Sequence, residues 1–184
     1  RFIPKYSRAA KKRMLLVAIS LLNRLGITFV HDAGTDLETI EILKDIISEK
    51  QLNICIYAML NDDHRVYDSY LTSGPFFDDN GYLTIRTIKL FLDGALGSRG
   101  AALLRPYYDD PENTGIILLN TQQAINKVKK FNGAGFQVSI HCIGDRANRI
   151  GLHIFETVGE RKLRNRIEHA QIIHPDDLNR FSKL

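Results

Sequence analysis

Apolar residues along this chain follow two alternating patterns, one typical of helices and one typical of strands. Recurrence every three or four positions predicts helices over residues 7–25, 35–47, 121–132 and 145–159, and a last helix from 174. Short apolar runs predict strands over residues 27–30, 52–60, 82–92, 136–140 and 166–170. Strand and helix therefore alternate, which predicts an α/β fold with a parallel sheet, either flat or closed into a barrel.

Polar residues at the predicted helix starts can act as caps. Ser7 and Thr121 each precede a helical pattern, Thr35 and Glu38 have the spacing of a capping box, and Asp145 follows the strand breaker Gly144. The segment 61–80 is polar and aromatic, which predicts a short helix and a loop with a surface histidine. No linker or repeat interrupts the pattern, so we expect one domain over residues 1–184.

Composition narrows the class of protein. With 184 residues, 44% apolar and 25% charged, the chain can bury a core, and no apolar run approaches the ~20 residues of a membrane span. Cys55 and Cys142 lie in predicted strands, which favours reduced thiols and a cytoplasmic protein. The net charge of +4 is concentrated in residues 1–13 and 161–166. Tyr6 is the only aromatic residue near the first run after Phe2, so we interpret both runs as solvated helix faces and expect no nucleic-acid partner.

Ionisable residues cluster at the ends of predicted strands. His31 and Asp32, His141, and His169 each lie at or near the carboxyl end of an apolar run, where α/β proteins carry out chemistry. Core histidines satisfied by the backbone are the alternative interpretation.

Lys89 is unusual because it lies inside a predicted strand, where burying an ammonium group is costly. Its side chain could point to solvent, be paired, or carry CO₂ as a carbamate. A carbamate would donate anionic oxygen and could bridge two divalent metals, and imidazoles from the next two strands would complete a site suited to zinc.

The segment 93–120 is long and contains glycine and proline, which indicates either a functional or a disordered loop. It begins with the stretch GALGSRGAA, where glycines allow a ligand to approach the backbone. Arg99 in this stretch could hold a substrate carboxylate or carbonyl, or it could be a solvated loop arginine.

Four stretches together resemble a known family. GITFVHDAG (26–34), IKLFLDGALGSRGAAL (88–103), FQVSIHCIGDRAN (136–148) and RIEHAQIIHPDDLNRF (166–181) are similar to the amidohydrolase superfamily, specifically its family 3 of YtcJ-like metal-dependent hydrolases. The resemblance implies part of a TIM (β/α)8 barrel with metal at its carboxyl face. It also implies that Lys89, often carbamylated at this position, His141 and His169 are metal ligands from the fourth, fifth and sixth strands.

The chain also departs from this pattern. The superfamily supplies further ligands from an HxH on its first strand and a general-base aspartate on its eighth, and no HxH occurs in this sequence. By this count the chain holds strands two to six. Asp32 and Asp145 are not at the matching position for the missing base, and we interpret Asp145 as a helix cap.

We therefore expect a metal-dependent hydrolase that cleaves an amide or another non-peptide C–N bond with metal-activated water. The expected cofactors are one or two divalent ions, zinc first, and a carbamate on Lys89. Arg99, His31 and Asp32 are the candidate substrate-binding residues, with a small-molecule substrate, no membrane partner, and self-association into a homo-oligomer. The alternatives are a catalytically inactive fragment, a non-catalytic self-associating α/β module, and an unrelated flat α/β binding domain without metal.

Overall fold

The computed structural model describes residues 5–184, so Arg1 of the N-terminal basic run lies outside the described residues. The chain divides into two compact units, one ending at Thr87 and one running from Ile88 to Leu184. The boundary falls within one strand, and each unit is described by itself. The single-domain prediction stays a prediction.

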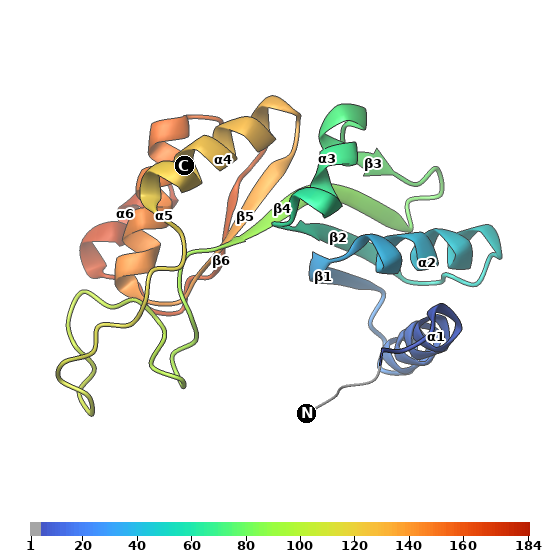
Figure 1. Ribbon diagram of the computed structural model, residues 1–184, viewed down its shortest axis with the longest axis horizontal. Helices are drawn as coiled ribbons and strands as arrows, with labels where there is room; N and C mark the ends of the chain where they lie inside the picture. The colour runs from blue at the N-terminus through green and yellow to red at the C-terminus, as the bar shows by residue number, and fades with distance from the viewer. Residues whose placement is uncertain (1–4) are drawn as a thin grey trace. The chain divides into compact units, whose positions relative to one another are not determined.

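The first unit contains an N-terminal helix and two strand–helix repeats (Figure 1). Its elements are α1 (Arg8–Arg24), β1 (Phe29–Thr35), α2 (Leu37–Ser48), β2 (Cys55–Asn61), α3 (His64–Ser73), β3 (Phe76–Phe77) and the start of β4 (Leu83–Phe91). β1 pairs in parallel with β2, β2 neighbours β4, and the short β3 pairs antiparallel with β4.

The second unit begins within β4 and continues through the long segment 93–120 (Figure 1). Its further elements are α4 (Thr121–Gly133), β5 (Gln137–Cys142), α5 (Asp145–Val158), β6 (Arg166–His169), a 3₁₀ turn η1 (Pro175–Asp177) and α6 (Leu178–Phe181). β5 lies between β4 and β6, and its pairing with β6 is parallel, with Cys142 opposite His169. The predicted alternation of strands and helices is confirmed, and β3 is an element that the sequence pattern missed.

Three predicted helix caps are wrong. β1 continues to Thr35, whose hydroxyl donates to Asp32, so the extended chain reaches Asp36 and that carboxylate caps α2 by accepting from the Thr39 N–H. Asn120 rather than Thr121 caps α4. The cap prediction also fails at α5, where Gly144 occupies the N-cap position without any side-chain hydrogen bond. Ser7 caps α1 as predicted.

Burial differs along the two units in a way that reflects sheet position. All residues of β5 are buried except His141, as expected for a strand with neighbours on both sides and helices over its face. β1 alternates exposed and half-buried residues until Thr35. Cys55 on β2 is half-buried and Cys142 on β5 is buried, and both thiols are free. Within residues 5–184 every helix falls short of the length and apolarity that a membrane crossing needs.

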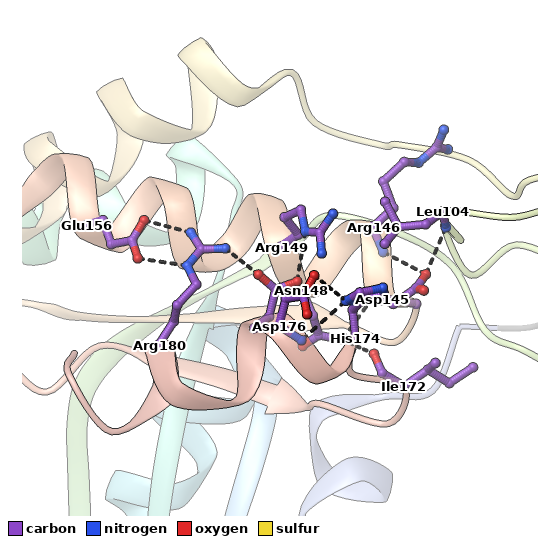
Figure 2. Close-up of polar contacts among 12 residues, drawn as sticks. Leu104, Asp145, Arg146, Asn148, Arg149, Glu156, Ile172, His174, Asp176 and Arg180 are labelled. Atoms are coloured by element: carbon purple, nitrogen blue, oxygen red, sulfur yellow. Dashed lines mark hydrogen bonds and ion pairs between the residues drawn. The ribbon is translucent and has the colours of Figure 1, made fainter.

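Polar side chains of α5 fix the loops that follow the strands of the second unit (Figure 2). Asp145 accepts from the backbone N–H of Leu104, at 2.8 Å, and so anchors the segment 93–120. The buried Asn148 amide donates to the carbonyls of Gly144 and Ile172, at 2.9 and 3.0 Å. These bonds hold the segments after β4, β5 and β6 against the start of one helix.

An ion-pair chain continues along the same helix toward its C-terminal end (Figure 2). Arg149 donates to Asp177 at 2.8 Å, Asp177 also accepts from Arg180, and Arg180 pairs with Glu156. Asp177 is 3% exposed, and the hydrogen bonds from both arginines outweigh its burial and lower its pKa. The chain therefore attaches the turn after β6 to α5 by charge-assisted bonds, which are the stronger kind.

Candidate metal centre

Lys89 on β4 is a buried lysine, with 2% of its surface exposed. Its Nζ donates to the Leu90 carbonyl at 3.1 Å and lies 3.8 Å from the centroid of the Phe91 ring. Burial lowers the pKa of Lys89 to about 8, although the nearby carboxylate of Glu168 opposes the shift. The solvent-facing interpretation of this lysine is wrong. Burial instead favours the neutral amine, which is the form that can react with CO₂.

His141 and His169 come from neighbouring strands, and their rings meet edge to face with centroids 4.7 Å apart. Burial lowers the pKa of His141, although the Gly94 carbonyl opposes the shift. The neutral imidazole that results has the free lone pair that metals require. His169 ends β6 with a φ of 72°, a backbone conformation that residues other than glycine rarely adopt and that often marks functional positions.

Glu168 is a site residue that the sequence analysis missed. It accepts from the Ser139 hydroxyl at 2.7 Å and from Arg166 Nε at 2.8 Å. Burial opposes its ionisation, but these hydrogen bonds outweigh burial and lower the pKa of Glu168. An ionised carboxylate therefore lies near the buried Lys89. The signal was present in the sequence, because Glu168 adjoins His169 within a strand.

Asp93 is the second missed residue, and it is 1% exposed just beyond β4. Its carboxylate accepts from three backbone N–H groups and lies 3.6 Å from Nε2 of His141. An aspartate between the strand and the glycine-rich segment in the stretch LFLDGALG could have been noticed from its position alone.

The side chains of the second unit fit a divalent ion only if Lys89 is modified to carry an anionic oxygen. Within residues 5–184, no group of three or more His, Cys, Asp or Glu side chains has the geometry to hold a metal. An unmodified lysine is not a metal ligand of this kind. The amine of Lys89 is nevertheless buried close to the two imidazoles. Two imidazole nitrogens and an anionic oxygen on a modified Lys89 make the mixed set that zinc accepts.

His31 and Asp32 lie in the first unit, inside β1 and not beyond its end. The His31 ring is exposed and stacks on Tyr57, with centroids 4.8 Å apart and planes 22° apart. The centroid of the Phe29 ring lies 5.3 Å from that of the same His31 ring. Asp32 accepts from the Thr35 hydroxyl at 2.8 Å. Their predicted role in substrate binding stays a prediction.

Arg99 lies in the segment 93–120 with a φ of 55°, which is uncommon for a residue with a side chain. Its guanidinium is exposed and pairs with Asp109 through Nε at 3.3 Å and Nη2 at 2.7 Å. Arg99 would have to exchange this partner to bind a substrate carboxylate. Its substrate-binding role also stays a prediction.

Comparison with known proteins identifies the family. Residues 2–184 match the model of the Amidohydrolase family. Protein LONG AFTER FAR-RED 3 of Arabidopsis thaliana is 32% identical over 175 residues, which are 86% of this chain and 30% of that protein. The Bacillus subtilis protein YtcJ is 32% identical over 113 residues, which are 61% of this chain and 20% of that protein.

A solved structure supports the same conclusion. An uncharacterized metal-dependent hydrolase of Pyrococcus horikoshii OT3 has a TM-score of 0.85 and 30% identity, covering 97% of this chain and 36% of that one. The chain thus spans about a third of the length of these relatives or less. The predicted fold class, part of an α/β barrel of the metal-dependent hydrolase type, is confirmed, and the chain belongs to the amidohydrolase family.

Proposed function

We propose that this chain forms the metal-binding part of a hydrolase that cleaves an amide or another non-peptide C–N bond of a small molecule. The observation that carries the proposal is the meeting of Lys89, His141 and His169, which come from the adjacent strands β4, β5 and β6. One is a buried amine and the others are neighbouring imidazoles, so their shared position has no evident purpose in packing. The family and the metal-dependent hydrolase that shares the fold support this assignment.

The two histidines would bind a divalent ion, zinc first, through neutral nitrogens. A divalent ion held there would supply Lewis acidity, which polarises a substrate carbonyl and lowers the pKa of water to about 7. Lys89 contributes through a prior modification. Its neutral amine would attack CO₂, forming a bond between Nζ and carbon and releasing one proton to solvent, and the resulting carbamate would supply an anionic oxygen ligand.

Zinc binding by the purified chain tests the proposal. Stripped protein is titrated with zinc by calorimetry, and the metal retained after dialysis is measured by elemental mass spectrometry. Lys89→Ala and His169→Ala are expected to lose most of the zinc. Lys129→Ala and His153→Ala are matched controls, because these residues are exposed on α4 and α5, and both should retain it. Equal zinc retention in all four variants would contradict the metal site.

The carbamate has a separate readout. Carbon NMR of the protein in isotope-labelled bicarbonate is expected to show a carbamate carbonyl signal, and Lys89→Arg should lack it because a guanidinium does not form this adduct. A wild-type spectrum without the signal would leave Lys89 as an amine and remove the oxygen ligand from the proposal.

Hydrolysis and self-association separate the proposed hydrolase from a non-catalytic module. Hydrolysis by this chain is assayed with a panel of amides, ureas and cyclic imides, with and without added zinc. A self-associating module without catalytic function would instead show concentration-dependent sedimentation, no zinc binding and no hydrolysis. Self-association, cytoplasmic location and the absence of a nucleic-acid partner stay predictions.

A further inference from the structure

Phe91 is a large apolar side chain that stays partly open beside the proposed metal ligands. It is the last residue of β4 and is 44% exposed, whereas Lys89, two positions earlier, is 2% exposed. Side chains two positions apart share one face of a strand, so both residues belong to the same face of β4. Burial along this face therefore ends at the Phe91 ring, which is the first open surface beyond the buried amine.

The Phe91 ring lies next to two of the three proposed ligands. Lys89 Nζ lies over the ring, 3.8 Å from its centroid, and the centroid of the His141 ring is 5.3 Å away with the planes tilted by 39°. The backbone holds this arrangement, because the Leu92 N–H donates to the His141 carbonyl at 3.0 Å. A molecule whose reacting bond lies at these ligands therefore brings its neighbouring group within reach of the ring.

Exposed apolar side chains continue from Phe91 onto the segment that follows β4. The Leu118 N–H donates to the Leu92 carbonyl at 2.8 Å, which returns the segment 93–120 to the end of the strand. In the second unit, the exposed large apolar side chains lie at the end of β4 or on this segment, with Leu178 on α6 as the exception. The open apolar surface is thus gathered at one strand end and the segment after it, and is not spread over the unit.

We propose that Phe91 is a specificity-determining residue whose ring binds an aromatic or bulky apolar group next to the scissile C–N bond of the substrate. The inference rests on the proposed function, because it requires the reacting bond to lie at the proposed metal ligands. Lys89 Nζ covers one face of the ring, which leaves the opposite face and the edge to the substrate, and aromatic rings pair through both. The competing interpretation is that Phe91 only shields the Lys89 amine from water.

The first experiment compares two zinc-binding molecules that differ in one group. Zinc-loaded protein is titrated by calorimetry with benzohydroxamate, which carries a phenyl ring, and with acetohydroxamate, which carries a methyl group. We expect the wild type to bind benzohydroxamate about tenfold more tightly, and Phe91→Ala to lose most of this ratio. Phe77→Ala is the matched control, because Phe77 is an exposed phenylalanine on β3, and it should keep the wild-type ratio.

The ratio of the two affinities decides between the interpretations. An unchanged ratio in Phe91→Ala would overturn the proposal. An equal loss of affinity for both molecules would also overturn it, because Phe91 would then act only through Lys89. Phe91→Leu keeps an apolar side chain without an aromatic ring, and a ratio at least about threefold below wild type is expected there even if Phe91→Ala fails to fold.

A metal-free measurement separates this inference from the proposed function. NMR of the zinc-free chain with excess benzohydroxamate is expected to show nuclear Overhauser effects between the phenyl protons of the ligand and the Phe91 ring protons. If these effects appear but the wild type binds no zinc, the proposed function fails and the contact with the Phe91 ring stands. If zinc binds but neither the effects nor the preference for the phenyl group appears, the metal site stands and the role of Phe91 is overturned.

Discussion

β1 and β5 begin from similar sequences and reach different outcomes. Each is a short strand that contains one histidine, His31 as the third residue of β1 and His141 as the second-last residue of β5. The His31 ring is exposed and stacks on aromatic neighbours. The side chain of His141 is 13% exposed and lies against His169 and Asp93. A histidine in a strand is therefore a candidate ligand only where neighbouring elements supply further polar groups.

Sheet position explains the difference. β5 has β4 on one side and β6 on the other, so residues from three strands and the segment 93–120 surround its end. Among residues 5–184, β1 has β2 as its one ladder partner, and its end is covered less. Burial makes electrostatic interactions stronger and displaces pKa values. That is why the pKa of His141 is lowered by its surroundings.

The largest effect on stability should come from adding a side chain at Gly144, just after the end of β5. Gly144→Ala places a methyl group 1.9 Å from the Ala102 carbonyl, and backbone cannot rotate away as a side chain can. We expect destabilisation of at least about 3 kcal/mol, measured by urea unfolding. Gly97→Ala is the control, because its added Cβ has no neighbour within 4 Å and its φ is not positive. Similar stability of the two variants would contradict the close packing of these segments.

The comparison between the histidines can be tested directly. His141→Ala should weaken zinc binding about 100-fold, close to 2.7 kcal/mol, since it removes a proposed ligand. His31→Ala should leave zinc binding unchanged and lose only an aromatic stack on an exposed strand. Calorimetric titration of both variants gives the ratio. A larger loss in His31→Ala would reverse the assignment.

The buried side-chain amide of Asn148 supports the loops of the second unit. Asn148→Ala removes the side-chain donor that the Gly144 and Ile172 carbonyls share, and leaves Gly144 with the backbone N–H of residue 148 alone. We expect a loss of about 2 kcal/mol in the free energy of unfolding. Asn126→Ala on the exposed face of α4 should change it by less than about 0.5 kcal/mol. Equal effects would show that the amide does not fix these loops.

The smallest effect concerns how the helices after β1 and β5 begin. Asp36 caps α2 with its side chain, whereas α5 begins at Gly144 without a side-chain cap. Asp36→Ala should cost about 1 kcal/mol. The Thr39 N–H lowers the pKa of Asp36, so the ionised cap stabilises the fold above the unfolded pKa of about 3.9, and this contribution disappears as pH falls through the lower folded value. The stability difference from wild type should therefore shrink in acid. A constant difference would mean that the carboxylate charge contributes nothing.

Much of the site could be predicted from residues that break a local pattern. Lys89 inside an apolar strand and histidines at strand ends are visible as exceptions in the sequence. Asp93 and Glu168 were not singled out, because an aspartate before glycine and a glutamate in an alternating strand look ordinary. Their importance comes from partners 29 to 51 positions away in the chain, such as Ser139, Ile143 and Gly144. Local patterns carry no information on such distant contacts.

The sequence by itself determined the order of strands and helices, because hydrophobic periodicity and chain breakers act over a few residues. It also determined the family, since four stretches together carry its pattern. Only the tertiary structure decided that Asp145 anchors Leu104 and does not cap its helix, that Lys89 is buried, and that His31 and His141 differ. Each of these depends on which backbone and side-chain groups meet across the fold, and burial then sets the strength of their interactions.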